Sequence, residues 1–252
     1  MDFRRLIHSL TFLCHASVVC EIGTTSNCYM RDYSPNMRYN TREVVHNFTF
    51  VETEVTPYHK QWEQDGVVSR EVWEKAGSNG FLNVYIPEEH GGVGADYKSA
   101  VIIHEELTSA GATGLSFYAH SDIVMPYLSK YGSDEQRKRF IPAMTAGTCI
   151  TAIAMSEPGA GSDLQGLQTH AERVGDDYIL NGSKTWISNG QLADAVLVVA
   201  KTKKEGRAAH GLSFFVVERG MPGFERGKNL RKIGLKAQVC SAHRGVCKLV
   251  LV

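Results

Sequence analysis

The densest group of residues that could do chemistry is the segment Ala154-Met-Ser-Glu-Pro-Gly-Ala-Gly-Ser-Asp-Leu-Gln-Gly166. Its glycines leave backbone N–H groups uncovered, and Ser156 and Ser162 add hydroxyl groups. Such a loop can bind a phosphate group or the polar edge of a heterocycle through main-chain donors. The segment matches neither the GxxxxGK[ST] pattern nor the GxGxxG pattern of phosphate-binding loops. The residues alone therefore leave two interpretations open: an anion-binding loop or an ordinary glycine-rich turn.

A second segment, Lys184-Thr-Trp-Ile-Ser-Asn-Gly190, combines an aromatic ring with a hydroxyl group. On a regular strand Trp186 and Ser188 would lie on the same face, because side chains alternate between the two faces. An aromatic plate beside a hydroxyl group is suited to hold a flat conjugated ring. Aromatic residues more often belong to a hydrophobic core, so this segment alone favours a core tryptophan.

The elements before these segments are expected to be helical, over residues 31–148. Helix-capping residues predict where three helices begin: Ser69, Asp96 and Ser133. Ser133 and Gln136 have the spacing of a capping box, in which each side chain bonds the other residue's backbone N–H. Pro142 is expected to end that last helix.

Residues 149–238 alternate short β-rich runs with turn signals, which predicts a second domain made of strands. Asn181-Gly182 is a strong signal for a two-residue hairpin turn. Seven short strands without intervening helices indicate an antiparallel sandwich or barrel. The predicted fold class is α+β, with an all-α helical domain followed by an antiparallel β-sandwich or barrel domain. The expected strands are residues 149–155, 167–174, 178–180, 184–187, 193–202, 211–218 and 224–230.

Composition excludes several classes of protein. The chain has 252 residues, of which 43% are hydrophobic and 21% charged, and its formal net charge is zero. This composition does not fit a disordered chain, and the charge balance gives no general attraction to nucleic acid. No segment approaches the roughly 18 apolar residues of a membrane-spanning helix. Residues 1–30 are left as an unassigned extension or a weak targeting segment.

The cysteines are concentrated at the two ends of the chain. Of the six cysteines, only Cys149 lies between residues 30 and 239. Cys240, His243 and Cys247 could supply three zinc ligands, but a fourth ligand is not evident and the spacing matches no common zinc finger. The favoured interpretation is thiols in a tail, and no metal site is predicted.

Taken together, the two segments resemble the acyl-CoA dehydrogenase family. Their residue sequences are most similar to the long-chain branch of that family. The resemblance runs from about residue 33 to residue 238. Further segments in the expected order support it: Ser69-Arg-Glu-Val-Trp-Glu-Lys-Ala-Gly77, Ile141-Pro-Ala-Met-Thr-Ala-Gly147, Ala209-His-Gly-Leu-Ser213 and Leu230-Arg-Lys-Ile-Gly-Leu-Lys-Ala-Gln238.

The resemblance implies an FAD site. Ser156 would face the edge of the flavin ring, and Ser162 would contact both FAD and the acyl-CoA. Trp186 would shield the flavin, and the hydroxyl group of Ser188 would bond near flavin N5. The implied cofactor-binding residues are Ile153, Ala154, Met155, Ser156, Glu157, Pro158, Gly159, Ala160, Gly161, Ser162, Trp186, Ile187 and Ser188. The implied substrate-binding residues are Ser162, His210 and Gly211.

The resemblance also implies a reaction, the α,β-dehydrogenation of a fatty acyl-CoA thioester to trans-2-enoyl-CoA in fatty acid β-oxidation. A carboxylate base would remove the α-proton while FAD accepts a hydride from the β-carbon. Electrons would pass to electron-transferring flavoprotein. The implied location is the mitochondrial matrix, although the targeting signal in residues 1–30 is weak.

After residue 238 the sequence departs from the family pattern, and residues 239–252 are predicted to be a tail outside it. The family continues with a C-terminal four-helix domain that carries the glutamate base and most contacts of the homo-oligomer. That domain is expected to be absent, so the chain would be truncated at its C-terminus. No catalytic residue is assigned, and Glu105, Glu106 and Glu157 are not taken as the base.

Two hypotheses follow from this departure. The first is an acyl-CoA dehydrogenase that is catalytically incomplete in these 252 residues. The alternative is a non-catalytic truncated product that binds flavin weakly or binds partners.

Overall fold

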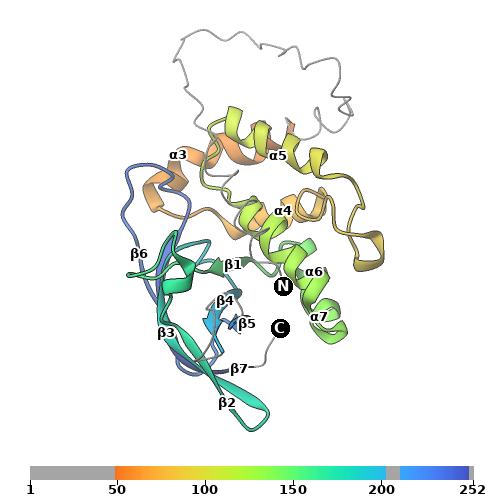
Figure 1. Ribbon diagram of the computed structural model, residues 1–252. Helices are drawn as coiled ribbons and strands as arrows, with labels where there is room; N and C mark the ends of the chain where they lie inside the picture. The colour runs from red at the N-terminus through yellow and green to blue at the C-terminus, as the bar shows by residue number, and fades with distance from the viewer. Residues whose placement is uncertain (1–48, 203–210, 250–252) are drawn as a thin grey trace. The chain divides into compact units, whose positions relative to one another are not determined.

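The computed structural model describes residues 49–202 and 211–249, which all belong to one compact unit (Figure 1). Helices occupy the first part of this range and strands the second, which confirms the predicted fold class. The predictions for residues 1–30 and for His210 lie outside the described residues.

The predicted helix starts are confirmed. The side chain of Ser69 accepts a hydrogen bond from the N–H of Glu71, and Asp96 caps the next helix in the same way. Ser133 and Gln136 form the expected capping box. The helical elements of the described part are η1 (Val51–Val55), α3 (Thr56–Asp65), α4 (Arg70–Ser78), η2 (Glu88–His90), α5 (Tyr97–Ser109), η3 (Ala119–Val124), α6 (Met125–Tyr131), α7 (Asp134–Thr145) and, between the first two strands, η4 (Leu164–Gly166).

The prediction that Pro142 ends its helix is wrong, because α7 continues through the proline to Thr145. A proline in a helix loses one backbone hydrogen bond and crowds the preceding turn. Ile141, directly before the proline, and Met144, two residues after it, are buried at 1% and 0% exposure. Their packing outweighs the local cost of the proline and keeps the helix going.

The second part of the described chain is one seven-stranded sheet, in which β1-β4-β2-β3-β7-β6 are neighbours in that order and β5 also pairs with β4. Most pairs are antiparallel, as predicted, but β1 and β2 each run parallel to β4, so the sheet is mixed. The chain between β1 and β4 includes β2 and β3, and this long connection allows β4 to run parallel to β1. The strands are β1 (Thr151–Ala154), β2 (His170–Val174), β3 (Asp177–Ser188), β4 (Ala195–Lys201), β5 (Leu212–Glu218), β6 (Phe224–Asn229) and β7 (Cys240–Leu249).

The hairpin turn lies elsewhere than predicted. Asn181-Gly182 is inside β3, and the two-residue turn is Gly175-Asp176, because Val174 pairs with Asp177. Gly175 has φ +65°, a value that suits glycine. Gly182 instead permits a close approach, since a Cβ there would lie 2.3 Å from Thr169 Oγ1.

Residues 240–249 were predicted to lie in a tail outside the family pattern. In the structure they form β7, which pairs with β3 along most of its length and with β6 on its other side. The last part of the described chain is therefore an interior strand of the sheet.

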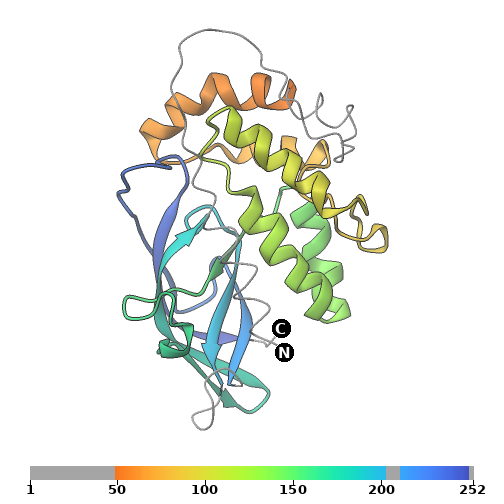
Figure 2. The ribbon, with the colours of Figure 1, turned by 45° about the horizontal axis from the view of Figure 1, so that its top comes forward.

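Three hydrophobic clusters hold this unit together. One lies among the helices around Trp73 and Leu82. A second joins α6 and α7 to β4 and β5, the helices and strands that lie beside each other in Figure 2, and a third fills the inside of the β region. Strand β4 serves the last two clusters, because Leu197 faces the helices and Val196 faces the interior. Both faces of β4 are buried, which explains its continuous apolar sequence.

Candidate functional site

The two segments that the sequence singled out are joined in the structure, and we call residues 153–162 and 184–190 together the paired-motif site. The N–H of Thr185 donates to the carbonyl of Ser156 at 2.9 Å. The Lys184 ammonium lies 2.8 Å from Glu157 Oε1 and donates to the carbonyl of Met155 at 2.8 Å. The loop after β1 and the end of β3 are therefore held together by both backbone and side-chain bonds.

Glu157 uses its carboxylate inside the protein. Besides Lys184, the carboxylate accepts from the N–H of Gln168 at 2.5 Å and the N–H of Thr169 at 3.0 Å. Burial acts to raise the pKa of Glu157, but these donors outweigh it and hold the pKa below its usual range. Burial in turn lowers the pKa of Lys184, an effect that Glu157 partly offsets. The predicted cofactor role of Glu157 therefore does not extend to its carboxylate, which faces inward.

Neither a contact inside the protein nor the backbone conformation requires glycine at positions 159 and 161. A Cβ placed on Gly159 or Gly161 would meet nothing within 4 Å, and neither residue has a positive φ. Within the described part of the chain, the N–H groups of Gly159, Gly161 and Ser162 donate to no acceptor. The loop therefore presents a row of backbone donors to its exterior, with room for close approach of another molecule.

The serine hydroxyl groups of the loop are available as well. Ser156 is half-buried and Ser162 is exposed. Neither hydroxyl group has a hydrogen-bond partner among the residues that the structure describes. Together with the free N–H groups, they form a surface that can bind an anion or a polar ring edge through hydrogen bonds.

Trp186 is exposed, so the core tryptophan that its segment alone favoured is wrong. Its side chain is 58% exposed, whereas Ile187 beside it is 1% exposed. The strand pairing shifts register between Lys184 and Ile187, and Trp186 has φ +59°. A bulky residue at positive φ costs about 1 to 3 kcal/mol and is found mainly at functional sites. Ser188, half-buried, follows with its Oγ 3.9 Å from Cys240 Sγ.

The remaining predicted residues of the loop after β1 include both buried and exposed positions. Ala154 and Ala160 are buried, and Ile153 and Met155 are half-buried. Pro158 is exposed at the tip of the loop. Gly211 lies at the start of β5, where its carbonyl accepts from the N–H of Thr202 at 2.7 Å. The structure thus brings the residues of 153–162 and 186–188 together, and no bond joins Gly211 to them.

Several residues that fix the site were missed by sequence reasoning, and Asn189 is the nearest. It is buried, has φ +64°, and its Nδ2 donates to the carbonyls of Ser116 and Thr151 at 3.2 and 3.3 Å. It ties the end of β3 to the helical region and to β1. Its place before Gly190 was a usable signal, because asparagine is among the few residues that tolerate a left-handed backbone.

His120 makes a similar link between the helices and β1. Its Nδ1 accepts from the N–H of Thr151 at 3.1 Å, so the proton is on Nε2, which donates to the carbonyl of Met144 at 3.1 Å. Burial lowers the pKa of His120 to about 4, so the ring is neutral at physiological pH.

Charged and amide side chains complete this junction. Arg70 forms a 2.6 Å ion pair with Asp194, which also accepts from the N–H of Ile150 at 2.9 Å. Gln238 donates to the hydroxyl groups of Ser116 and Tyr118. None of these residues shows a sequence pattern that would have revealed the contact, because their partners are 44 to 124 residues away in the chain.

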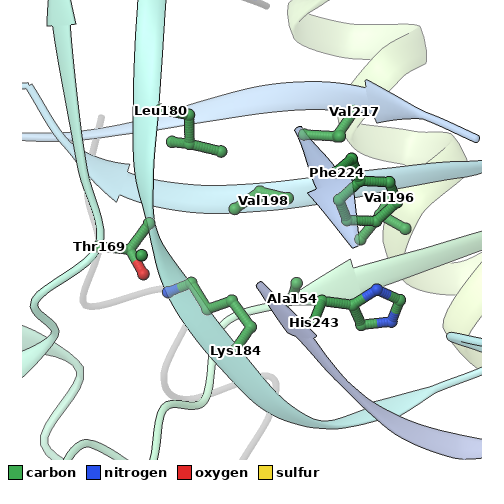
Figure 3. A pocket seen from close by; sticks show the side chains of 10 residues that line it. Ala154, Thr169, Leu180, Lys184, Val196, Val198, Val217, Phe224 and His243 are labelled. Carbon is green, nitrogen blue, oxygen red and sulfur yellow. The ribbon is translucent and has the colours of Figure 1, made fainter. Parts of the chain in front are cut away.

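A small cavity lies inside the β region, and Ala154 and Lys184 of the paired-motif site belong to its lining (Figure 3). Its walls are mostly apolar, and Lys184 is the charged side chain in its lining. Two buried polar atoms in the lining, Thr169 Oγ1 and His243 Nδ1, have no hydrogen-bond partner within the described part. His243 stacks on Phe224 and shares a hydrogen bond with Ser241.

The described residues contain no group of three side chains that could hold a metal ion, and the Cys247 side chain is not among them. In the same ranges, every helix is too short or too polar to cross a bilayer.

Comparison with known proteins places this geometry in a family. The models of the acyl-CoA dehydrogenase N-terminal domain and of the acyl-CoA dehydrogenase middle domain match residues 40–148 and 152–244. The chain belongs to the acyl-CoA dehydrogenase family. The middle-domain match continues into β7, and the predicted resemblance to this family is confirmed.

Among individual relatives, the mitochondrial long-chain specific acyl-CoA dehydrogenase of Sus scrofa is 60% identical over 190 residues, which are 75% of this chain and 44% of that protein. The chain thus spans about half the length of the curated relatives that it matches. An acyl-CoA dehydrogenase structure from Geobacillus kaustophilus is 40% identical with a TM-score of 0.80, covering 84% of this chain and 57% of that one. A glutaryl-CoA dehydrogenase from Mycobacterium smegmatis in complex with FADH2 is 30% identical with a TM-score of 0.77, covering 83% and 53%.

Proposed function

We propose that this protein is an FAD-dependent acyl-CoA dehydrogenase that converts a fatty acyl-CoA thioester to the trans-2-enoyl-CoA. The observation that carries the proposal is the paired-motif site, in which free backbone donors and an exposed tryptophan are held side by side. The long-chain relatives support a long acyl chain as the substrate class.

The residues of the site fit a flavin nucleotide. The cradle at Gly159 and Gly161 is open where a Cβ would fill it, and its N–H groups suit the pyrophosphate. We assign Ser156 to the polar edge of the ring and Trp186 to its face, with the Ser188 hydroxyl group near the reactive nitrogen. When bound, FAD supplies the hydride acceptor for the reaction.

The protein's own contribution in these segments is binding and orientation. Ser162, His210 and Gly211 are proposed to contact the acyl-CoA, and Trp186 to cover the ring from water. The side chain of Glu157 cannot serve as the base, because its two oxygens accept three internal hydrogen bonds. A carboxylate outside residues 153–162 and 186–188 must therefore remove the α-proton.

We further propose that electron-transferring flavoprotein accepts the electrons and that the protein works in the mitochondrial matrix. The second part is supported by relatives whose names state a mitochondrial location. The first is supported by the family to which the chain belongs.

A second candidate function is flavin binding without catalysis. It is favoured by one observation: the sole carboxylate in the two flavin-facing segments, that of Glu157, is occupied internally. Binding of FAD would then serve an interaction with a partner.

One titration separates these functions. The purified 252-residue chain is titrated with FAD, and palmitoyl-CoA is then added without oxygen while flavin absorbance is recorded. We expect saturable FAD binding, followed by bleaching if the chain is catalytic. Binding without bleaching would favour the second candidate, and no FAD binding at all would contradict both.

A further inference from the structure

We propose that the buried ion pair of Lys184 and Glu157 positions the two halves of the flavin site relative to each other. This inference rests on the proposed function, because it concerns the geometry in which the loop and the Trp186 bulge meet a flavin. Neither side chain is proposed to touch the cofactor. Both act through the segments that they hold.

The pair is unusual among the ion pairs of the described residues in having both side chains buried, at 4% and 5% exposure. In every other pair there, at least one side chain is more than a quarter exposed. A buried pair stabilises a fold little more than apolar residues of similar size would, because desolvation of both charges offsets their attraction. Stability is therefore a weak reason for placing two charges here.

The contacts of the pair reach both flavin-facing segments. Glu157 follows Ser156 directly, and its carboxylate binds the N–H groups of Gln168 and Thr169, so the loop is closed on itself. Lys184 is two residues before Trp186 and donates to the carbonyl of Met155.

Between the two charged residues, the hydrogen bond from the N–H of Thr185 to the carbonyl of Ser156 completes the link. A shift of the pair would therefore move Ser156 and Trp186 together. Lys184 also lines the internal cavity (Figure 3). These side-chain and backbone bonds therefore connect the start of the bulge to the loop after β1.

The test removes both charges in the variant Glu157→Gln/Lys184→Met, so that no unpaired charge is buried. The matched control is Glu54→Gln/Lys75→Met, which makes the same chemical change in an ion pair of the helical region. Each protein is examined by chemical denaturation, by FAD titration, and by the fluorescence anisotropy of Trp186 without FAD. A Trp186→Phe version of each protein isolates the signal of Trp186 from those of Trp62 and Trp73.

We expect the double variant to keep a denaturation midpoint close to wild type while its Kd for FAD rises about tenfold, equivalent to about 1.4 kcal/mol. Without FAD, the anisotropy of Trp186 should fall, because the bulge loses its anchor. The control variant should change neither the Kd for FAD nor the anisotropy of Trp186. If the double variant does not fold, Glu157→Gln/Lys184→Gln serves, since it also leaves no buried charge unpaired and both amides can hydrogen-bond.

Unchanged anisotropy of Trp186 in a folded variant would overturn the positioning role, whether or not FAD binds. Wild-type affinity for FAD in the double variant would overturn it as well. A wild-type chain that binds no FAD would contradict the proposed function, and in that case the anisotropy still decides whether the pair holds the bulge.

Discussion

Two glycine-rich loops of this chain look alike in sequence and differ in what their glycines do. In the loop at residues 87–94, a Cβ on Gly92 would lie 1.8 Å from the carbonyl oxygen of Ile86. Gly91 and Gly94 there have φ +80° and +68°. In the loop at residues 157–162, Gly159 and Gly161 have neither a positive φ nor any atom within 4 Å of a Cβ.

The backbone donors of the two loops differ in the same way. Each N–H from His90 to Gly94 donates to a carbonyl of residues 83–88. In the second loop, only the N–H groups of Glu157 and Ala160 donate to a carbonyl within the described part, and each donates to the other residue. Since backbone donors without an internal acceptor are suited to bind a partner, the first loop serves the fold, and the second is the one that we propose to bind a ligand. Counting glycines does not separate these roles, but following each N–H to its acceptor does.

The largest effect is expected for Gly92→Ala in the loop that serves the fold. The new methyl group would overlap the carbonyl of Ile86, and overpacking of this kind costs about 3 kcal/mol. Chemical denaturation should show this loss of stability. A Gly92→Ala protein as stable as the wild type would break the contrast, because the first loop would then also tolerate a side chain.

A similar loss is expected on acidification, at a histidine whose two ring nitrogens are both used inside the protein. The folded pKa of His120 is about 4 because the ring is buried, against 6.5 when unfolded. The unfolded state binds a proton first, so stability is complete above pH 6.5 and decreases as the pH falls toward 4, by about 3 kcal/mol. Denaturation curves across this range measure the slope.

The control for this prediction is His120→Asn, in which the slope between these pH values should flatten. The depressed pKa of Glu157 adds a loss of the same sign only at lower pH, as the carboxylate is protonated. An unchanged slope in His120→Asn would show that other groups carry the pH dependence.

A smaller effect is expected for Trp186→Ala, which extends the contrast to side chains. Trp186 is 58% exposed, so its loss should change the free energy of unfolding by less than about 0.5 kcal/mol. The Kd for FAD should rise about tenfold, since stacking against an aromatic ring contributes about 1 kcal/mol or more. The matched control is Trp73→Ala, whose buried ring should be needed for folding. Unchanged FAD affinity in Trp186→Ala would remove the ring from the site.

The smallest effect is expected for Gly175→Asn in the β2–β3 turn. Gly175 has φ +65° but open space around a Cβ, and asparagine adopts this conformation readily. Stability should change by less than about 0.5 kcal/mol, and FAD affinity should stay unchanged. Melting and FAD titration test both statements. A change in FAD affinity would mean that distant turns of the β region also control the site.

Local signals made much of the fold predictable from the sequence. Ser69, Asp96 and Ser133 cap the helices that they predict, because a capping bond joins residues two or three positions apart. The helix end predicted at Pro142 and the turn predicted at Asn181-Gly182 were wrong because long-range contacts decide the structure there. Burial of Ile141 and Met144, and pairing of β3 on both sides, are long-range effects that override local preference.

The candidate site was predictable as two segments, but its internal construction was not. Lys184 and Glu157 are 27 residues apart, and nothing in their spacing showed that they pair. Trp186 was ambiguous because exposure depends on the bulge in β3, which a regular alternation of side chains does not anticipate. Asn189 and His120 belong to a junction between the helices and β1 that only the tertiary structure defines.

The central claim, that the loop at residues 157–162 is kept open for a flavin, is tested most directly by Gly159→Ala/Gly161→Ala. FAD titration and thermal melting are measured on this variant and on the wild-type chain. Because the added methyl groups meet no protein atom but enter the cradle, we predict an unchanged melting temperature and a Kd for FAD raised about tenfold or more. Equal FAD affinity in the two proteins would contradict the account.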